Sequence, residues 1–181
     1  AIAAQSIRQL PKFARSEMAI TAWSVAQLRF VDAPLIEALA AAAVQTLMPE
    51  ETAGSQQAKR MQLSNFAWAF ATLEFKSPPL MQAISSESIR LIAQALYAGG
   101  VASRRGLVDT QQLANTAWSW AALPLIDDPL FAAISAAAVR TISSASGMEL
   151  ANMAWAYAAL HVADGPLMSA IAEASLRRMA E

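Results

Sequence analysis

The segment LANTAWSWAAL at Leu113–Leu123 decides the fold, because the chain contains three further copies of it. It recurs almost unchanged as LANMAWAYAAL at Leu150–Leu160. A looser copy, LSNFAWAFATL, spans Leu63–Leu73, and a more divergent one, MAITAWSVAQL, spans Met18–Leu28. These four copies and their flanks account for nearly the whole of the 181-residue chain. Such self-similarity is typical of proteins built by stacking one supersecondary unit.

Each copy predicts a pair of helices. Apolar residues recur with a helical period around a central tryptophan, which we number position 0, so a first helix, helix A, is expected from about −8 to +6. Eleven residues after each tryptophan comes a proline, preceded at position +9 by a helix-capping residue, and this pair predicts the start of a second helix, helix B. The capping residues are Asp32, Ser77, Asp127 and Asp164.

The repeat predicts an all-α fold, a right-handed α-solenoid of tandem antiparallel helix pairs, with four repeats plus a preceding helix. Residues 1–10 match 83–92, which predicts helix B of an earlier repeat and suggests that this array, residues 1–181, is part of a longer one. Insertions after helix B separate some of the repeats. The four predicted repeats are residues 15–48, 61–97, 109–143 and 147–181.

The position-0 tryptophans are predicted to be structural core residues. Alanine occupies positions −1 and +3 in all four copies, and small residues beside an indole let neighbouring helices approach closely while the ring fills the gap. Trp120, at position +2, is expected to lie in the core as well. The alternative is that the tryptophans stack on nucleic-acid bases. The four residues are Trp23, Trp68, Trp118 and Trp155.

Composition limits the classes of function. The chain is 56% apolar and only 15% charged, against about 25% charged residues in typical soluble domains. No run of 18 apolar residues occurs, so no membrane span is expected, and the apolar surplus suggests a surface that is given to a partner. A net charge of −1 provides no basic footprint for nucleic acid. The chain has no cysteine for disulfides or thiolate metal sites.

Two ladders of polar residues are candidate binding residues. An arginine at position +22 could contact phosphates or an acidic partner, or could stabilise the last turn of helix B by about 0.3–1 kcal/mol. An asparagine at −3 could read base edges, or could bond a backbone group of an adjoining helix. The arginines, with an equivalent in the opening segment, are Arg8, Arg90, Arg140 and Arg177, and the asparagines are Asn65, Asn115 and Asn152.

Four further cations, in or at the end of the two longer insertions, are candidate contacts because loops carry function more often than core faces do. The alternative is ordinary solvated charge. No catalytic motif accompanies them, and the single histidine, His161, has no second ligand at a metal-binding spacing. We therefore expect a protein that is not an enzyme and uses neither cofactor nor metal. The four cations are Lys59, Arg60, Arg104 and Arg105.

A Leu-Ala-Asn-x-Ala-Trp core in a repeat of this length resembles the octotricopeptide-repeat proteins. It is also similar to the related heptatricopeptide-repeat and FAST-kinase-like arrays. The resemblance covers residues 18–181 and is closest in the last two copies. It implies a helical protein of the chloroplast or mitochondrion that associates with RNA.

Two functions are expected from these observations. The apolar surplus and near-neutral charge favour a non-catalytic scaffold that binds other protein subunits of a large organelle assembly, such as a ribosome or photosynthetic complex. The resemblance implies the alternative, an octotricopeptide-like factor that binds single-stranded RNA in organelle RNA processing, stability or translation.

Overall fold

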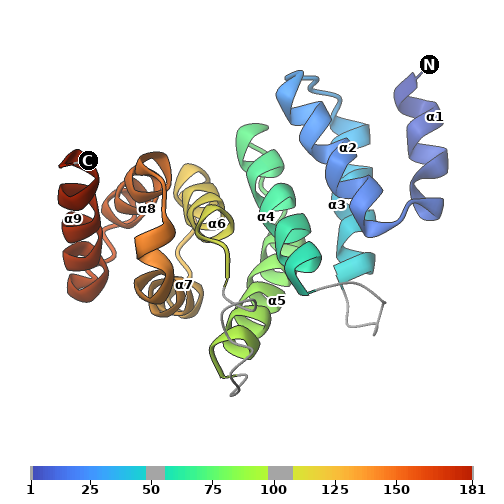
Figure 1. The fold of residues 1–181 in the computed structure, drawn as a ribbon. Helices are drawn as coiled ribbons and strands as arrows, with labels where there is room; N and C mark the ends of the chain where they lie inside the picture. Colours follow the sequence, from blue (N-terminus) through green and yellow to red (C-terminus); the bar gives the residue numbers. More distant parts are fainter. Residues whose placement is uncertain (1, 48–55, 98–107, 181) are drawn as a thin grey trace.

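The structure, a computed structural model, describes residues 2–47, 56–97 and 108–180. These residues form helices and turns and no strand, so the all-α prediction is confirmed (Figure 1). Two short 3₁₀ segments, Leu10–Lys12 and Ile142–Ser144, accompany the α-helices. The α-helices in the described ranges are α1 (Ile2–Gln9), α2 (Arg15–Gln27), α3 (Ala33–Leu47), α4 (Gln56–Thr72), α5 (Pro78–Tyr97), α6 (Thr110–Ala122), α7 (Asp128–Thr141), α8 (Gly147–Ala159) and α9 (Gly165–Met179).

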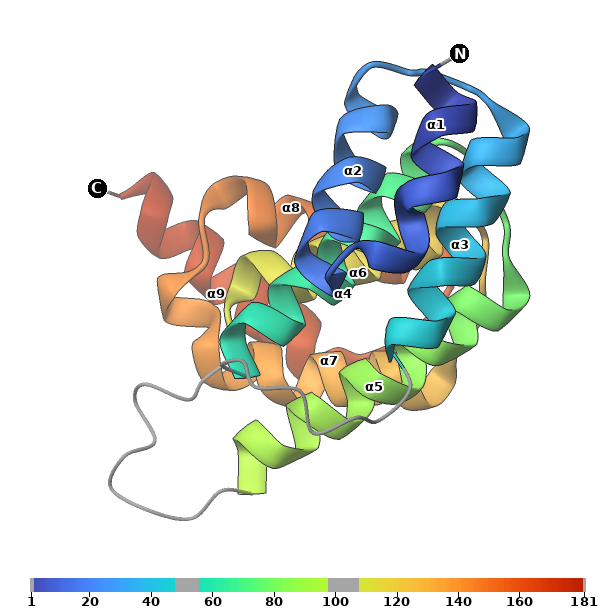
Figure 2. The same ribbon diagram turned by 90° about the vertical axis from the view of Figure 1, so that its right-hand side faces the viewer.

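The helices pack in two layers. Helices α2, α4, α6 and α8 carry the tryptophan motif and pack side by side in chain order; we call them the A layer. Helices α3, α5, α7 and α9 follow them in each repeat and form the B layer, and α1 packs against α3. The most extensive packing between helices lies within the A layer. The chain ends lie at opposite ends of this row (Figure 1), and Figure 2 looks along it.

Three of the four A-layer helices begin as predicted, and all four end slightly earlier than predicted. Three of them start eight residues before the tryptophan, while α4 starts at Gln56, twelve residues before Trp68. All four end at +4 rather than +6, because a left-handed residue at +6 stops the helix and the next N–H bonds back to the +2 carbonyl. Examples are Glu74 and His161, with φ of 54° and 56°, and the bond from Phe75 to Phe70 at 2.9 Å.

The B-layer helices begin at the predicted caps. In three repeats the carboxylate of an aspartate at position +9 accepts a hydrogen bond from the backbone N–H three residues on, which satisfies one of the unpaired donors of the first turn. The proline then falls within that turn, where its missing N–H has no partner to lose. The bonds run from Leu35 to Asp32 at 3.0 Å, from Leu130 to Asp127 at 3.1 Å and from Leu167 to Asp164 at 2.9 Å.

The core is built on position +2 of the A-layer helices, which holds Val25, Phe70, Trp120 or Tyr157, all buried. Trp120 is 2% exposed, so its predicted core position is confirmed. The Tyr157 hydroxyl donates to the Phe131 carbonyl at 2.7 Å, and the two rings pack edge to face with centroids 4.9 Å apart. Burial raises the pKa of Tyr157. Tyr157 thus joins α8 of the A layer to α7 of the B layer.

The prediction that Trp23 and Trp155 are core residues is wrong. They are 43% and 48% exposed, while Trp68 and Trp118 are partly buried and pack against the core. The reason is geometric, because an α-helix turns by about 100° per residue. Positions 0 and +2 therefore lie on nearly opposite faces, and when +2 faces the B layer, position 0 faces away from it.

Substitutions of Trp120 and Trp155 should differ in their effect on stability. Trp120→Ala empties a core position and should lower the free energy of unfolding by about 3–5 kcal/mol. Trp155→Ala removes a side chain that is already half in water and should cost less than half as much. Urea unfolding followed by circular dichroism measures both values. Equal losses would contradict the assignment of position 0 to the exposed face.

Candidate functional site

The four position-0 tryptophans form a row across the exposed face of the A layer, which we call the tryptophan stripe. Trp23 and Trp68 lie with ring centroids 6.4 Å apart, and Trp118 and Trp155 lie with centroids 6.5 Å apart. These contacts show that position 0 of α2 lies beside position 0 of α4, and that position 0 of α6 lies beside position 0 of α8. Positions −7, −3 and +4 share this face with the tryptophan, because they are one or two turns away from it.

The face around the tryptophan stripe carries no charge. Four positions on each of four helices, −7, −3, 0 and +4, are all exposed or partly exposed, and not one holds Asp, Glu, Lys or Arg. Three of its aliphatic side chains are strongly exposed: Ile20 at 61%, Met61 at 50% and Met148 at 76%. Besides the tryptophans, the residues are Ser16, Met61, Gln111 and Met148 at −7, Ile20, Asn65, Asn115 and Asn152 at −3, and Gln27, Thr72, Ala122 and Ala159 at +4.

The asparagines at −3 lie beside the tryptophans on this face. Asn65, Asn115 and Asn152 are each partly exposed. Within the described ranges their carboxamides form no hydrogen bond, so the backbone bond expected from the structural interpretation is not made. Their donors and acceptors are therefore free to pair with a ligand.

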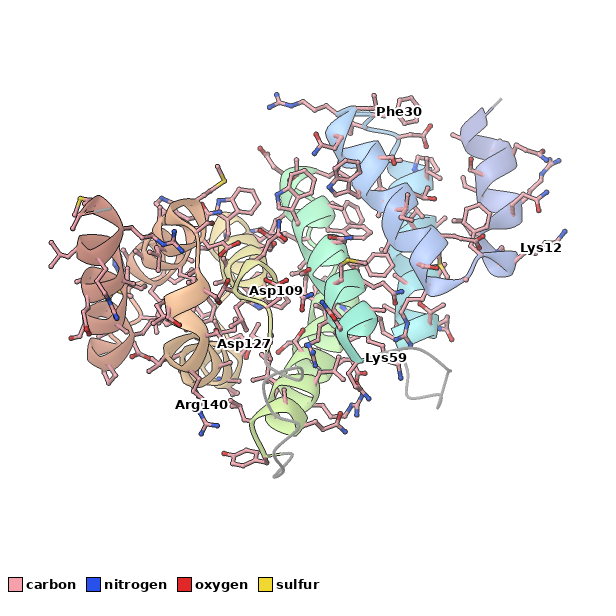
Figure 3. The ribbon with its side chains drawn as sticks, in the orientation of Figure 1. Lys12, Phe30, Lys59, Asp109, Asp127 and Arg140 are labelled. Carbon is pink, nitrogen blue, oxygen red and sulfur yellow. The ribbon has the colours of Figure 1, made fainter. Side chains whose placement is uncertain are left out.

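The arginine ladder lies elsewhere, on α1 and the B layer. Arg90 donates to Glu87 through two bonds of 2.7 and 2.5 Å, and this pairing raises the pKa of Arg90. Arg140, at the edge of the molecule in Figure 3, donates to the Leu96 carbonyl at 3.3 Å. Arg177 lies 3.3 Å from Glu173. The arginines and asparagines thus do not share one surface.

The alternative interpretation of the ladder placed each arginine in the last turn of a helix. This placement is confirmed for Arg8, Arg140 and Arg177. It is wrong for Arg90, because α5 continues for seven residues beyond it to Tyr97. A cation in a last turn stabilises the helix dipole without any ligand.

Lys59 and Arg60 do not lie at the end of an insertion, because α4 begins at Gln56 and includes both (Figure 3 labels Lys59). Arg60 is 8% exposed, and its Nε is buried without a hydrogen-bond partner. Burial lowers the pKa of Arg60, against the opposing effect of the Asp109 charge. Arg104 and Arg105 lie outside the described residues. Of the two described members of this group, Lys59 is partly exposed and Arg60 is buried.

A structural position explains Arg60 better than a binding role does. Arg60 and Gln112, whose Oε1 is also unpaired, line one cavity of about 20 Å³. They occupy position −8 of one repeat and −6 of the next. One repeat further on, the same two positions hold Thr110 and Glu149, which are joined by a hydrogen bond of 2.8 Å. Arg60 thus belongs to the contact between repeats.

Metal and membrane sites are not found in the described part of the chain. No group of three or more His, Asp or Glu side chains there could hold a metal ion. The helices of that part are also too short or too polar for any of them to cross a bilayer. His161 is exposed, at the left-handed turn that ends α8.

Comparisons with protein-family models and with curated proteins find no match to this chain. The expectation of an octotricopeptide-like family therefore depends on the repeated motif alone.

Replacement of Arg60 should not weaken the fold. Arg60→Met keeps an unbranched apolar stem and removes a buried donor without a partner, so stability should stay unchanged or rise by about 1 kcal/mol. Lys59→Met, one residue earlier, is the matched control and should change stability by less than about 0.5 kcal/mol. Urea unfolding measures both variants. A loss above about 1 kcal/mol for Arg60→Met alone would show that the guanidinium has a stabilising partner.

Proposed function

We propose that this chain is a non-catalytic helical-repeat scaffold that binds a protein partner through the tryptophan stripe. The two layers, with helices in chain order, support the right-handed α-solenoid expected from the repeat, an architecture that offers an extended binding surface. The observation that carries the proposal is the composition of the exposed A-layer face. Four indoles, two methionines and one isoleucine lie there among neutral amides and hydroxyls.

This composition matches the buried centre of protein interfaces. Such centres are enriched in tryptophan and methionine and depleted of charged residues, and tryptophan is prominent among the residues that dominate binding energy. The turn after α2 also exposes the apolar side chains of Leu28, Phe30 and Val31, together with Arg29 (Figure 3 labels Phe30). Large apolar surface patches of this kind mark sites of interaction with partners.

The second candidate is the octotricopeptide-like RNA-binding factor of organelle RNA processing, stability or translation. Exposed indoles favour it, because bases stack on aromatic side chains. Against it, neutralisation of phosphates supplies a large share of nucleic-acid affinity, and the stripe face holds no cation. Arg90 and Arg140 lie on the other layer with protein partners of their own. The charge distribution therefore favours a protein partner.

Membership of a large organelle assembly, such as a ribosome or photosynthetic complex, is also part of the proposal. It is supported by the family resemblance, and the apolar surplus agrees with a subunit that is covered by its neighbours.

Two probes separate the candidate functions: a display library of random dodecapeptides and a short oligouridylate. The wild-type chain should select peptides from the library, and the double substitution Trp23→Ala with Trp155→Ala should weaken their binding by about tenfold or more. The matched control, Arg140→Ala with Arg177→Ala, changes exposed residues of the B layer and should leave peptide affinity unchanged. Circular dichroism checks that each variant is folded.

The oligouridylate should not bind at low salt. Binding that falls steeply with added salt, and that the tryptophan substitutions abolish, would contradict the protein-binding scaffold and favour the RNA factor.

A further inference from the structure

If the tryptophan stripe binds a protein partner, as the proposed function states, the asparagines beside it constrain the conformation of the bound segment. Asn65, Asn115 and Asn152 lie on the successive A-layer helices α4, α6 and α8. Each precedes its tryptophan by three residues, so the carboxamide and the indole are neighbours on one helix face. A ligand that covers the indoles must also cover these amides. Because an unpaired buried amide is unfavourable, the ligand has to supply hydrogen-bonding groups there.

Peptide groups are the ligand chemistry that fits these amides. A carboxamide offers two N–H donors and one acceptor oxygen, so it can pair with a backbone carbonyl or N–H of any sequence. A phosphate or carboxylate would need a cation, and the surrounding positions hold none. Burying an unpaired charge against the indoles would be strongly unfavourable. The neutral face therefore fits an uncharged polypeptide segment.

One amide on each packed helix sets an expected spacing that can be compared with the periods of backbone conformations. Packed helices lie with axes about 8–10 Å apart, and each of the three helices provides one amide. Polyproline II has three residues per turn with a rise of about 3.1 Å each, so equivalent carbonyls recur on one side roughly every 9 Å. A β-strand repeats on one side about every 6.6 Å, and an α-helix turns about every 5.4 Å. The strand period is too short for one contact per helix. Residues i and i+7 of an α-helix recur about every 10.5 Å, but the backbone carbonyls of a helix are already bonded internally. Polyproline II combines a fitting period with free carbonyls.

Polyproline II also suits the tryptophans. Its backbone makes no internal hydrogen bonds, and segments in this conformation dock in grooves lined with aromatic side chains. The stripe provides one pair of contacting indoles, Trp23 with Trp68, on α2 and α4, and a second pair, Trp118 with Trp155, on α6 and α8. Proline rings can pack on these indoles while the carbonyls between them remain free to accept.

We infer that the tryptophan stripe binds an uncharged, proline-containing segment of the partner in the polyproline II conformation. The segment crosses α4, α6 and α8, and the amides of Asn65, Asn115 and Asn152 donate to carbonyls one turn apart. Three contacts at this period require a segment of about seven residues. Its sequence is recognised mainly through neutral character and proline content.

The probe is a capped decaproline titrated into the isotope-labelled full chain. The side-chain amide resonances of the three asparagines and the indole resonances of the four tryptophans should shift together and saturate. Asn115→Ala should weaken binding by about twofold to tenfold, the range for one net hydrogen bond. The matched control is Gln94→Ala, which removes an exposed amide of α5 in the B layer and should leave binding unchanged.

A capped, alanine-rich, helix-forming peptide serves as the comparison probe. Binding of this peptide or of selected dodecapeptides, with no response to decaproline, would overturn the inferred conformation and leave the protein-binding function standing. Decaproline binding that is equally strong in Asn65→Ala, Asn115→Ala and Asn152→Ala would overturn the role of the amides. No binding of any peptide would overturn this inference and the proposed function together.

Discussion

Close packing of neighbouring A-layer helices is the constraint on which the rest of the structure depends. Small residues around the tryptophan, such as Ala67 and Ala117, are completely buried and allow this approach. The large residue at +2 then fills the space toward the B layer, as Trp120 and Tyr157 do. Because the helix turns by about 100° per residue, this arrangement turns position 0 away from the core. The same packing therefore builds the interior and exposes the indoles.

The helix pairs could be predicted because their signals are local. The carboxylate of Asp127, for example, caps the helix that begins at the next residue. No tertiary contact is needed to recognise this signal. The direction in which a helix faces is not local. Positions 0 and +2 are both apolar, and only the neighbouring helices decide which of them is buried. The burial of Arg60 could likewise not be predicted, because position −8 is covered by position −6 of the next repeat, which is a tertiary contact.

The candidate site could be predicted in part. Asn115 and its equivalents stood out as a ladder in the sequence, and the structure places them on an open face. The absence of charge from that face could be recognised only after the exposed positions of each helix were known. A sequence-wide net charge of −1 averages over surfaces that differ in character: the stripe face holds no charged side chain, whereas other faces of both layers carry cations and carboxylates. This separation, rather than overall composition, favours a neutral polypeptide partner over a phosphate backbone.

Collisional quenching of single tryptophans by acrylamide tests the central claim most directly. Chains that retain one tryptophan, with the other four replaced by phenylalanine, report the exposure of each ring separately. The account predicts that Trp23 and Trp155 are quenched readily and emit at long wavelength, whereas Trp120 is protected and emits at short wavelength. Equal protection of all three rings in the folded chain would contradict an exposed tryptophan stripe.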